Sequence, residues 1–167
     1  VPKVTKNSGK NYTKITFYPD LQKFGMKTID CKSLLERRTI DATATTNKKV
    51  AVFLNGIKLS SKTLTDYSRL FTENKLYSVD LSIGNFVWEL VVTLGTPEDN
   101  VAFVNGIFTK KGTHIDFITR QLTKKLAVLL KKKNVKESFI KDNLRIFLRS
   151  TVQDPSFSSQ TKEELTT

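Results

Sequence analysis

The chain alternates between two patterns of apolar and polar residues, one with the period of a strand and one with the period of a helix. Residues 13–18 alternate with β-forming side chains and stop at Pro19-Asp20, which predicts a first strand. Asn55-Gly56 and Gly84-Asn85 each separate two apolar runs and predict two hairpins. The strands expected from these patterns and from two later runs are 13–18, 50–54, 57–59, 77–83, 86–94, 100–109 and 144–148.

Helical spacing of apolar residues predicts four helices, over 28–42, 63–71, 137–143 and a long stretch that starts at Thr113. Asp30 falls in the first turn of the first helix, where the helix dipole favours an acid. Thr113 and Asp116 have the spacing of a capping box at the start of the longest helix. Five apolar residues share one face of that helix: Ile115, Ile118, Leu122, Leu126 and Leu129.

Positive charge is concentrated in one part of the chain. The sequence has 28 Lys and Arg against 16 Asp and Glu, a net charge of +12, and residues 109–149 hold twelve basic and three acidic residues. Arg120, Lys124 and Lys131 lie within about 40° of each other, opposite the apolar face of the longest helix. A polyanion is the expected partner. The alternatives are a solvated basic surface, and lysines that favour the helix dipole whether or not DNA is near.

Few residues offer catalytic or metal-binding chemistry. His114 is the single histidine and has no Gly-x-Ser-x-Gly element with it, so we expect it to make local hydrogen bonds rather than act as a base. Cys31 is the single cysteine and is expected to be buried packing; one Cys and one His exclude the usual zinc site. No Walker loop and no apolar run long enough for a membrane span occurs. With no internal repeat or linker, residues 1–167 are expected to form one domain.

The segment 154–167 carries the motif Gln160-Thr161-Lys162. With the residues around it, the motif reads Pro-x-Phe-x-Ser-Gln-Thr-Lys-Glu from Pro155 to Glu163. A loop lysine is a compact cation that can neutralise a phosphate oxygen. Alone the tripeptide is a weak signal. It gains weight from earlier motifs that come in the same order. These are Thr13-Lys14-Ile15-Thr16-Phe17-Tyr18-Pro19-Asp20-Leu21 through Lys23-Phe24-Gly25-Met26, Val52-Phe53-Leu54-Asn55-Gly56, Phe103-Val104-Asn105-Gly106-Ile107, Lys111-Gly112-Thr113-His114-Ile115-Asp116 and Lys131-Lys132-Lys133-Asn134.

Together these motifs resemble the transducer domain of eukaryotic-type type IIA DNA topoisomerases across almost the whole chain. The resemblance implies an α+β, ribosomal-protein-like fold that follows a GHKL ATPase domain, with a four-stranded sheet, helices packed on one side and a left-handed crossover. It implies that Gln160 and Lys162 contact the terminal phosphate of ATP, with Thr161 in the same loop, so that 154–167 forms the phosphate-sensing loop. It also implies that Lys131, Lys132 and Lys133 meet duplex DNA.

The resemblance further implies a fragment of a larger homodimeric enzyme. ATP and Mg²⁺ would be bound mainly by an upstream ATPase domain, and a downstream core would cleave DNA, so this chain would not be catalytic alone. The glycine-free link from Asn134 to Phe139, and Asn105-Gly106-Ile107 where cellular members usually have Asn-Ser-Ile, suggest a viral member from a large DNA virus. An intracellular location at sites of DNA replication follows, in the host cytoplasm for a viral protein or the nucleus for a cellular one.

Two other functions fit the same residues. A nucleic-acid-binding module without ATP coupling would use the same basic helix, since this fold also occurs in ribosomal proteins. The corresponding domain of another member of the ATPase superfamily, such as a mismatch-repair or chaperone protein, is the third reading. A downstream DNA-cleavage core in the parent gene would exclude that third reading.

Overall fold

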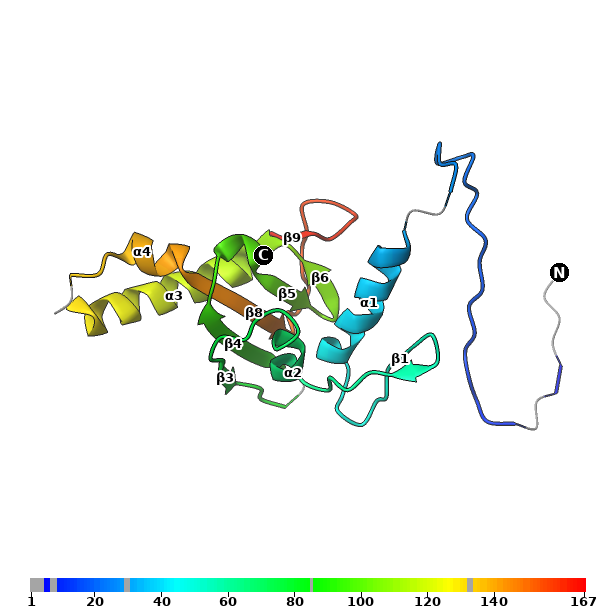
Figure 1. The fold of residues 1–167 in the computed structure, drawn as a ribbon, viewed down its shortest axis with the longest axis horizontal. Helices are drawn as coiled ribbons and strands as arrows, with labels where there is room; N and C mark the ends of the chain where they lie inside the picture. Colours follow the sequence, from blue (N-terminus) through cyan, green and yellow to red (C-terminus); the bar gives the residue numbers. More distant parts are fainter. Residues whose placement is uncertain (1–4, 7–8, 29–30, 85, 132–133) are drawn as a thin grey trace. The chain divides into compact units, whose positions relative to one another are not determined.

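The computed structural model describes residues 5–6, 9–28, 31–84, 86–131 and 134–167, and the chain divides into two compact units, 1–33 and 34–167. The predicted Asp30, Asn85, Lys132 and Lys133 features lie outside the described residues. The elements, drawn in Figure 1, are α1 (Lys32–Thr45), β1 (Phe53–Leu54), β2 (Ile57–Lys58), α2 (Leu64–Ser68), β3 (Tyr77–Asp80), β4 (Trp88–Leu94), a 3₁₀ turn (Pro97–Asp99), β5 (Val101–Val104), β6 (Ile107–Thr109), β7 (Lys111–Gly112), α3 (Thr113–Leu129), α4 (Glu137–Asp142), β8 (Leu144–Ser150) and β9 (Glu164–Leu165).

The first unit contains no strand in its described residues, so the strand predicted over 13–18 is wrong. A strand needs a partner for its backbone, and none pairs with this segment. Its apolar side chains are exposed, with 84% of Ile15 and 93% of Tyr18 open to solvent. The alternation of apolar and polar residues over 13–18 therefore does not correspond to a buried face in the described part of this unit. Cys31 is half-buried rather than buried.

The second unit is built on a five-stranded sheet with the order β3-β4-β8-β5-β6. β8 comes latest in the chain among these strands, yet it lies in the middle, antiparallel to β4 and parallel to β5 (Figure 1). Because a parallel neighbour requires a crossover, α3 and α4 fill the connection between β5 and β8. The sheet has five strands where four were predicted, and the handedness of the crossover stays a prediction.

Helices cover both faces of this sheet, so the prediction that they pack on one side is wrong. Successive residues of a strand point to opposite faces. Phe103 and Phe147 pack on one face with Tyr67 of α2 and Ala44 of α1. Ala102, Ile146 and Leu148 pack on the other face with Ile115 of α3. The chain thus has two apolar clusters separated by one sheet.

Asn-Gly pairs form the turns of two hairpins. Asn55 and Gly56 have φ of 50° and 82°, and they join β1 to β2 as predicted. Asn105 and Gly106 have nearly the same φ values, 51° and 81°, and join β5 to β6. The single strand predicted over 100–109 is therefore a hairpin, because this second Asn-Gly pair reverses the chain. The hairpin predicted around Gly84 forms as β3 and β4.

The capping box predicted at Thr113 does not form. Gly112 is the N-cap of α3 and makes no side-chain capping bond, while the Thr113 hydroxyl donates to the Thr167 carbonyl oxygen. The predicted helices otherwise appear as α1, α2, α3 and α4, each with shifted ends. In the described part of the chain, no helix is both long and apolar enough to cross a membrane.

Candidate functional site

The Gln160-Thr161-Lys162 loop leaves β8 and ends at β9. Lys162 adopts a left-handed backbone with φ of 58°, and its N–H donates to the Ser159 carbonyl at 3.1 Å. The hydroxyls of Ser159 and Thr161 lie 2.8 Å apart. Gln160 and Thr161 are exposed, and Lys162 is half-exposed. A tight turn therefore presents all three predicted phosphate-contacting residues on one loop.

The Lys162 ammonium has a ring neighbour but no carboxylate partner in the described chain. Its Nζ lies 5.8 Å from the centroid of Phe157, which is half-buried and bridges to Leu165. This bridge ties Phe157 to the strand that follows the loop. Ion pairs in the described chain engage the neighbouring Glu163 and Glu164 instead. The charge of Lys162 is thus available to an anion.

The loop is joined to α3 through a short parallel ladder. β9 pairs with β7 in the register Lys111 with Glu164 and Gly112 with Leu165. Two ion pairs span the ladder, from Lys110 to Glu163 at 3.0 Å and from Lys111 to Glu164 at 3.1 Å. We call this ladder and its two ion pairs the β7–β9 seam. Since β7 runs directly into α3, the seam connects the lysine loop to the longest helix.

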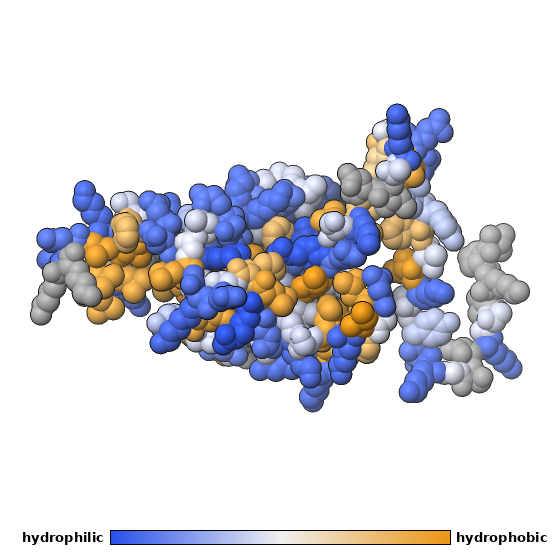
Figure 2. All heavy atoms as spheres, viewed as in Figure 1, coloured by the Kyte–Doolittle hydropathy of each residue, from blue (hydrophilic) through white to orange (hydrophobic). Residues whose placement is uncertain are grey.

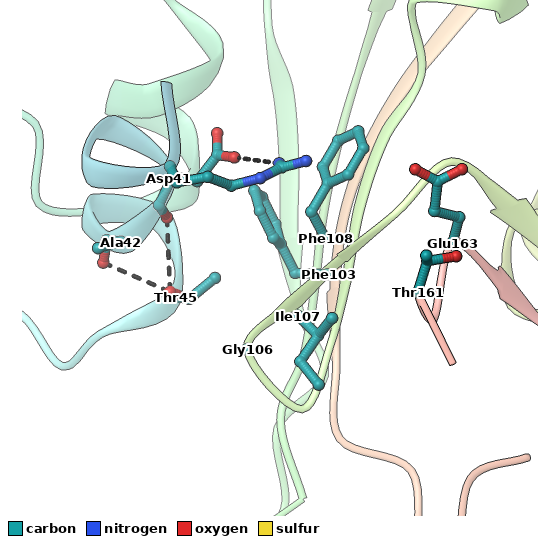
Figure 3. A pocket seen from close by; sticks show the side chains of 10 residues that line it. Asp41, Ala42, Thr45, Phe103, Gly106, Ile107, Phe108, Thr161 and Glu163 are labelled. Atoms are coloured by element: carbon teal, nitrogen blue, oxygen red, sulfur yellow. Dashed lines mark hydrogen bonds and ion pairs between the residues drawn. The ribbon is translucent and has the colours of Figure 1, made fainter. Parts of the chain in front are cut away.

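A cavity of about 350 Å³ lies between the loop, α1 and the β5–β6 hairpin. Figure 3 shows Asp41, Ala42 and Thr45 on one side, Phe103, Ile107 and Phe108 in the middle, and Thr161 and Glu163 on the far side. Arg38 also lines it, with its guanidinium carbon 4.4 Å from the centroid of Phe108. The cavity therefore brings α1 next to the loop that carries Lys162.

Asp41 on α1 is buried and fully engaged. Its Oδ1 accepts from the Arg37 Nε at 2.9 Å and from the Tyr67 hydroxyl at 2.7 Å, and its Oδ2 accepts from Arg38 at 2.8 Å. Burial, followed by the hydrogen bond to Asp41, raises the pKa of Tyr67 far above its usual range. The sequence analysis missed this cluster. The signal was there, because Asp41 follows Arg37 by four residues and Arg38 by three, the spacings at which side chains meet on a helix.

His114 is buried at the start of α3 and acts locally, as the sequence predicted. Its Nε2 lies 3.0 Å from the Thr109 hydroxyl, while its Nδ1 has no partner among the described residues. Burial lowers the pKa of His114 to about 4, so the ring is neutral at physiological pH. No described carboxylate hydrogen-bonds to the ring, and its one described partner is the buried Thr109 hydroxyl, so this geometry supports a packing role.

Three of the predicted basic residues are described, and all three are exposed on or just after α3. Arg120 and Lys124 are exposed on this helix, and Lys131 is exposed just beyond its end at Leu129. α3 begins at the β7–β9 seam and runs away from the lysine loop (Figure 1). At 1.5 Å per residue its 17 residues span about 25 Å. The structure thus places the candidate ATP residues and the candidate DNA residues at different places, linked by one helix.

No group of three or more His, Cys, Asp or Glu side chains that could hold a metal ion occurs among the described residues. The donors present around Lys162 fit a phosphate group rather than a cation, because the loop offers an ammonium, an amide and hydroxyls. Any nucleotide contact from this chain would therefore be to phosphate oxygens.

The sequence of this chain is similar to those of known proteins. A model of the DNA gyrase B family matches residues 51–167. The chain is 38% identical to DNA topoisomerase 2 of Arabidopsis thaliana over 99% of its length, and 37% identical to human DNA topoisomerase 2-alpha over 95%. It spans only 12% and 11% of those two relatives.

Solved structures agree with the sequence relatives. The ATPase region of Saccharomyces cerevisiae topoisomerase II superposes with a TM-score of 0.76 at 36% identity, covering 89% of this chain and 40% of that one. The ATPase and transducer domains of Balamuthia mandrillaris topoisomerase II give a TM-score of 0.65 at 30% identity, covering 80% of this chain and 35% of that one.

The fold is thus the mixed α+β fold of the type II topoisomerase ATPase region, and the chain corresponds to part of a eukaryotic-type enzyme of that class. More particularly, the chain belongs to the DNA gyrase B family.

Proposed function

We propose that this chain is the transducer part of an ATP-dependent type II DNA topoisomerase, which passes one duplex through a transient break in another. The family match and the likeness to a structure described as ATPase and transducer domains support this assignment. In this proposal the whole of 1–167 acts as one domain, and 154–167 is its phosphate-sensing segment. The chain couples ATP binding and hydrolysis to closure of a protein gate.

The observation that carries the proposal is the connection from Lys162 to α3 through the β7–β9 seam. Lys162 lies two residues before β9, β9 pairs with β7, and β7 continues into α3. A shift of the loop is therefore passed to the start of a rigid helix rather than lost in a flexible segment. The cations on that helix would move with it.

Lys162 is the proposed contact to the terminal phosphate of ATP, with Gln160 as a second donor and Thr161 in the same loop. The nucleotide and Mg²⁺ would be bound mainly by an upstream ATPase domain. Because the Lys162 ammonium has no carboxylate partner in the described chain, phosphate need not compete with an internal ion pair. Hydrolysis would remove the contact, and the loop would report the nucleotide state.

The proposed DNA surface consists of Arg120, Lys124 and Lys131, together with Lys132 and Lys133 from outside the described residues. Exposed Lys and Arg neutralise phosphates without reading sequence, so the surface would hold any duplex that enters the gate. The other proposed partners are the ATPase domain and DNA-cleavage core of the same polypeptide and a second copy of it. An intracellular location at sites of DNA replication, and a viral source, stay predictions.

The decisive experiment measures ATP hydrolysis, with and without duplex DNA, by the chain extended upstream to include the ATPase domain. Lys162→Ala should lower the DNA-stimulated rate about 100-fold, the order expected when one preorganised donor to a reacting group is lost. Lys62→Ala, which removes an exposed lysine far along the chain from the loop, is the matched control and should leave the rate unchanged.

Equal rates for Lys162→Ala and the control would refute the phosphate contact. A well-folded extended protein that binds DNA but hydrolyses no ATP would instead favour a nucleic-acid-binding module without ATP coupling.

A further inference from the structure

We propose that Arg120 and Lys141 hold one backbone phosphate of duplex DNA between them, in a cavity between α3 and α4. This inference rests on the proposed function and adds a residue, Lys141, that the basic face of α3 alone does not include. The cavity measures about 440 Å³ and is lined by Asp116, Thr119 and Arg120 of α3 and Lys141 of α4. Residues from two helices therefore meet around one space.

Both cations are available to a ligand. Arg120 and Lys141 are exposed, and the ion pairs in the described part of the chain involve other residues. α3 and α4 pack against each other, which keeps the two side chains on neighbouring supports. Thr119 adds a hydroxyl at the same cavity. The cavity is thus lined by three hydrogen-bond donors and one carboxylate, that of Asp116.

The side chains that line this cavity suit a phosphate group. A guanidinium can bind two phosphate oxygens at once, and an ammonium adds a point charge with three donors. The cavity is more than ten times the ~30 Å³ share of one water molecule, so it admits a phosphate with some of its hydration. Two cations and the Asp116 carboxylate leave a net charge of +1 there, matched to one phosphate.

The position of the cavity extends the proposed DNA surface sideways. Arg120 begins the row that continues to Lys124, about 6 Å along the axis of α3, and then to Lys131 just beyond the end of the helix. Figure 2 shows apolar side chains near the ends of α3 and α4, where Val128, Leu129 and Phe139 are exposed. Lys141 lies on α4, and through the cavity it joins the α3 row rather than those apolar residues. The proposed surface therefore gains one cation, Lys141, from the neighbouring helix α4.

The test measures the affinity of the 167-residue chain for a short mixed-sequence duplex over a range of salt concentrations. Each neutralised phosphate contributes about 0.9 to the slope of log affinity against log salt. Removing either cation leaves the cavity with no net charge, so Arg120→Gln and Lys141→Gln should each abolish most of this contact. The double variant should then lower the slope by about 0.9 in total, where two independent contacts would lower it by about 1.8.

Asp116→Asn should raise the affinity for the duplex, a result that misfolding would not produce. Removal of the carboxylate raises the net charge in the cavity, so affinity should rise in the wild-type background and should not rise once Lys141 and Arg120 are both replaced. Lys62→Gln removes one positive charge elsewhere and corrects for the change in net charge. Circular dichroism confirms that each variant is folded.

Two results would overturn the inference while the proposed function survives. One is a full slope loss of about 1.8 in the double variant, which would mean two separate phosphates. The other is a slope unchanged by Lys141→Gln while Lys124→Gln lowers it. A wild-type chain that binds no duplex at low salt would overturn the proposed DNA surface together with this site.

Discussion

Among single residues, Gly112 occupies a place in the β7–β9 seam that leaves no room for a side chain. A Cβ at this position would lie 2.5 Å from the Leu165 carbonyl oxygen and 2.7 Å from its nitrogen, and the backbone φ of 143° disfavours other residues. Backbone atoms cannot give way as a flexible side chain can. Only glycine lets β7 approach β9 this closely.

We expect Gly112→Ala to lower the free energy of unfolding by about 3 kcal/mol, because backbone strain and a backbone clash add. Gly56→Ala is the matched control, since Gly56 also has a positive φ but open space around it. That control should cost about 1 kcal/mol. Urea denaturation measures both, and equal losses would show that the seam tolerates a side chain.

His114 makes stability depend on pH in a defined window. Its pKa is about 4 in the fold against 6.5 in a free side chain, so the unfolded chain binds a proton more readily. Stability from this residue is complete above pH 6.5 and declines as pH falls towards 4. By pH 5 about 2 kcal/mol should be lost. His114→Gln should remove this decline, which denaturation curves at pH 7.5 and pH 5 would measure; an equal decline in both proteins would contradict it.

At the scale of elements, Asn105 joins the β5–β6 turn to the segment that leaves β8. Its Nδ2 donates to the Val152 carbonyl and its Oδ1 accepts from the Val152 N–H, both at 2.9 Å. The residue also adopts the left-handed conformation that asparagine tolerates. One side chain thus shapes a hairpin and fixes the start of the segment that leads to the lysine loop.

Asn105→Ala should therefore lower the free energy of unfolding by about 2–3 kcal/mol, from two lost hydrogen bonds and an unfavourable turn. Asn55→Ala is the matched control, because Asn55 has the same turn geometry and its side chain makes no hydrogen bond to a distant segment among the described residues. Thermal unfolding compares the two. A smaller loss at Asn105 than at Asn55 would refute the clamp between the turn and Val152.

Local sequence signals predicted elements well where the cause was local. The Asn55-Gly56 turn and the helices α2 and α3 follow from residues within a few positions. The capping box failed because the Thr113 hydroxyl bonds to Thr167, 54 positions away. The strand at 13–18 failed because its partner, which no local pattern can supply, is absent among the described residues.

For the whole molecule, the sequence named the candidate residues but not their relation to each other. Gln160, Thr161 and Lys162 came from a motif, and Arg120 and Lys124 from helical spacing. That a single ladder links the two groups depends on the pairing of β7 with β9, residues more than fifty positions apart. The part played by Lys141 depends likewise on how α4 packs against α3, which no periodicity within either helix reveals.

The central place of β8 has a consequence for synthesis. β4 and β5 are not neighbours in the finished sheet, because β8 lies between them and starts only at Leu144. A nascent chain must therefore wait, with Val91 and Phe103 still lacking their cover by Phe147, until β8 has left the ribosome. Until then the facing edges of β4 and β5 stay unpaired, and an unpaired strand edge is a template for pairing with another chain.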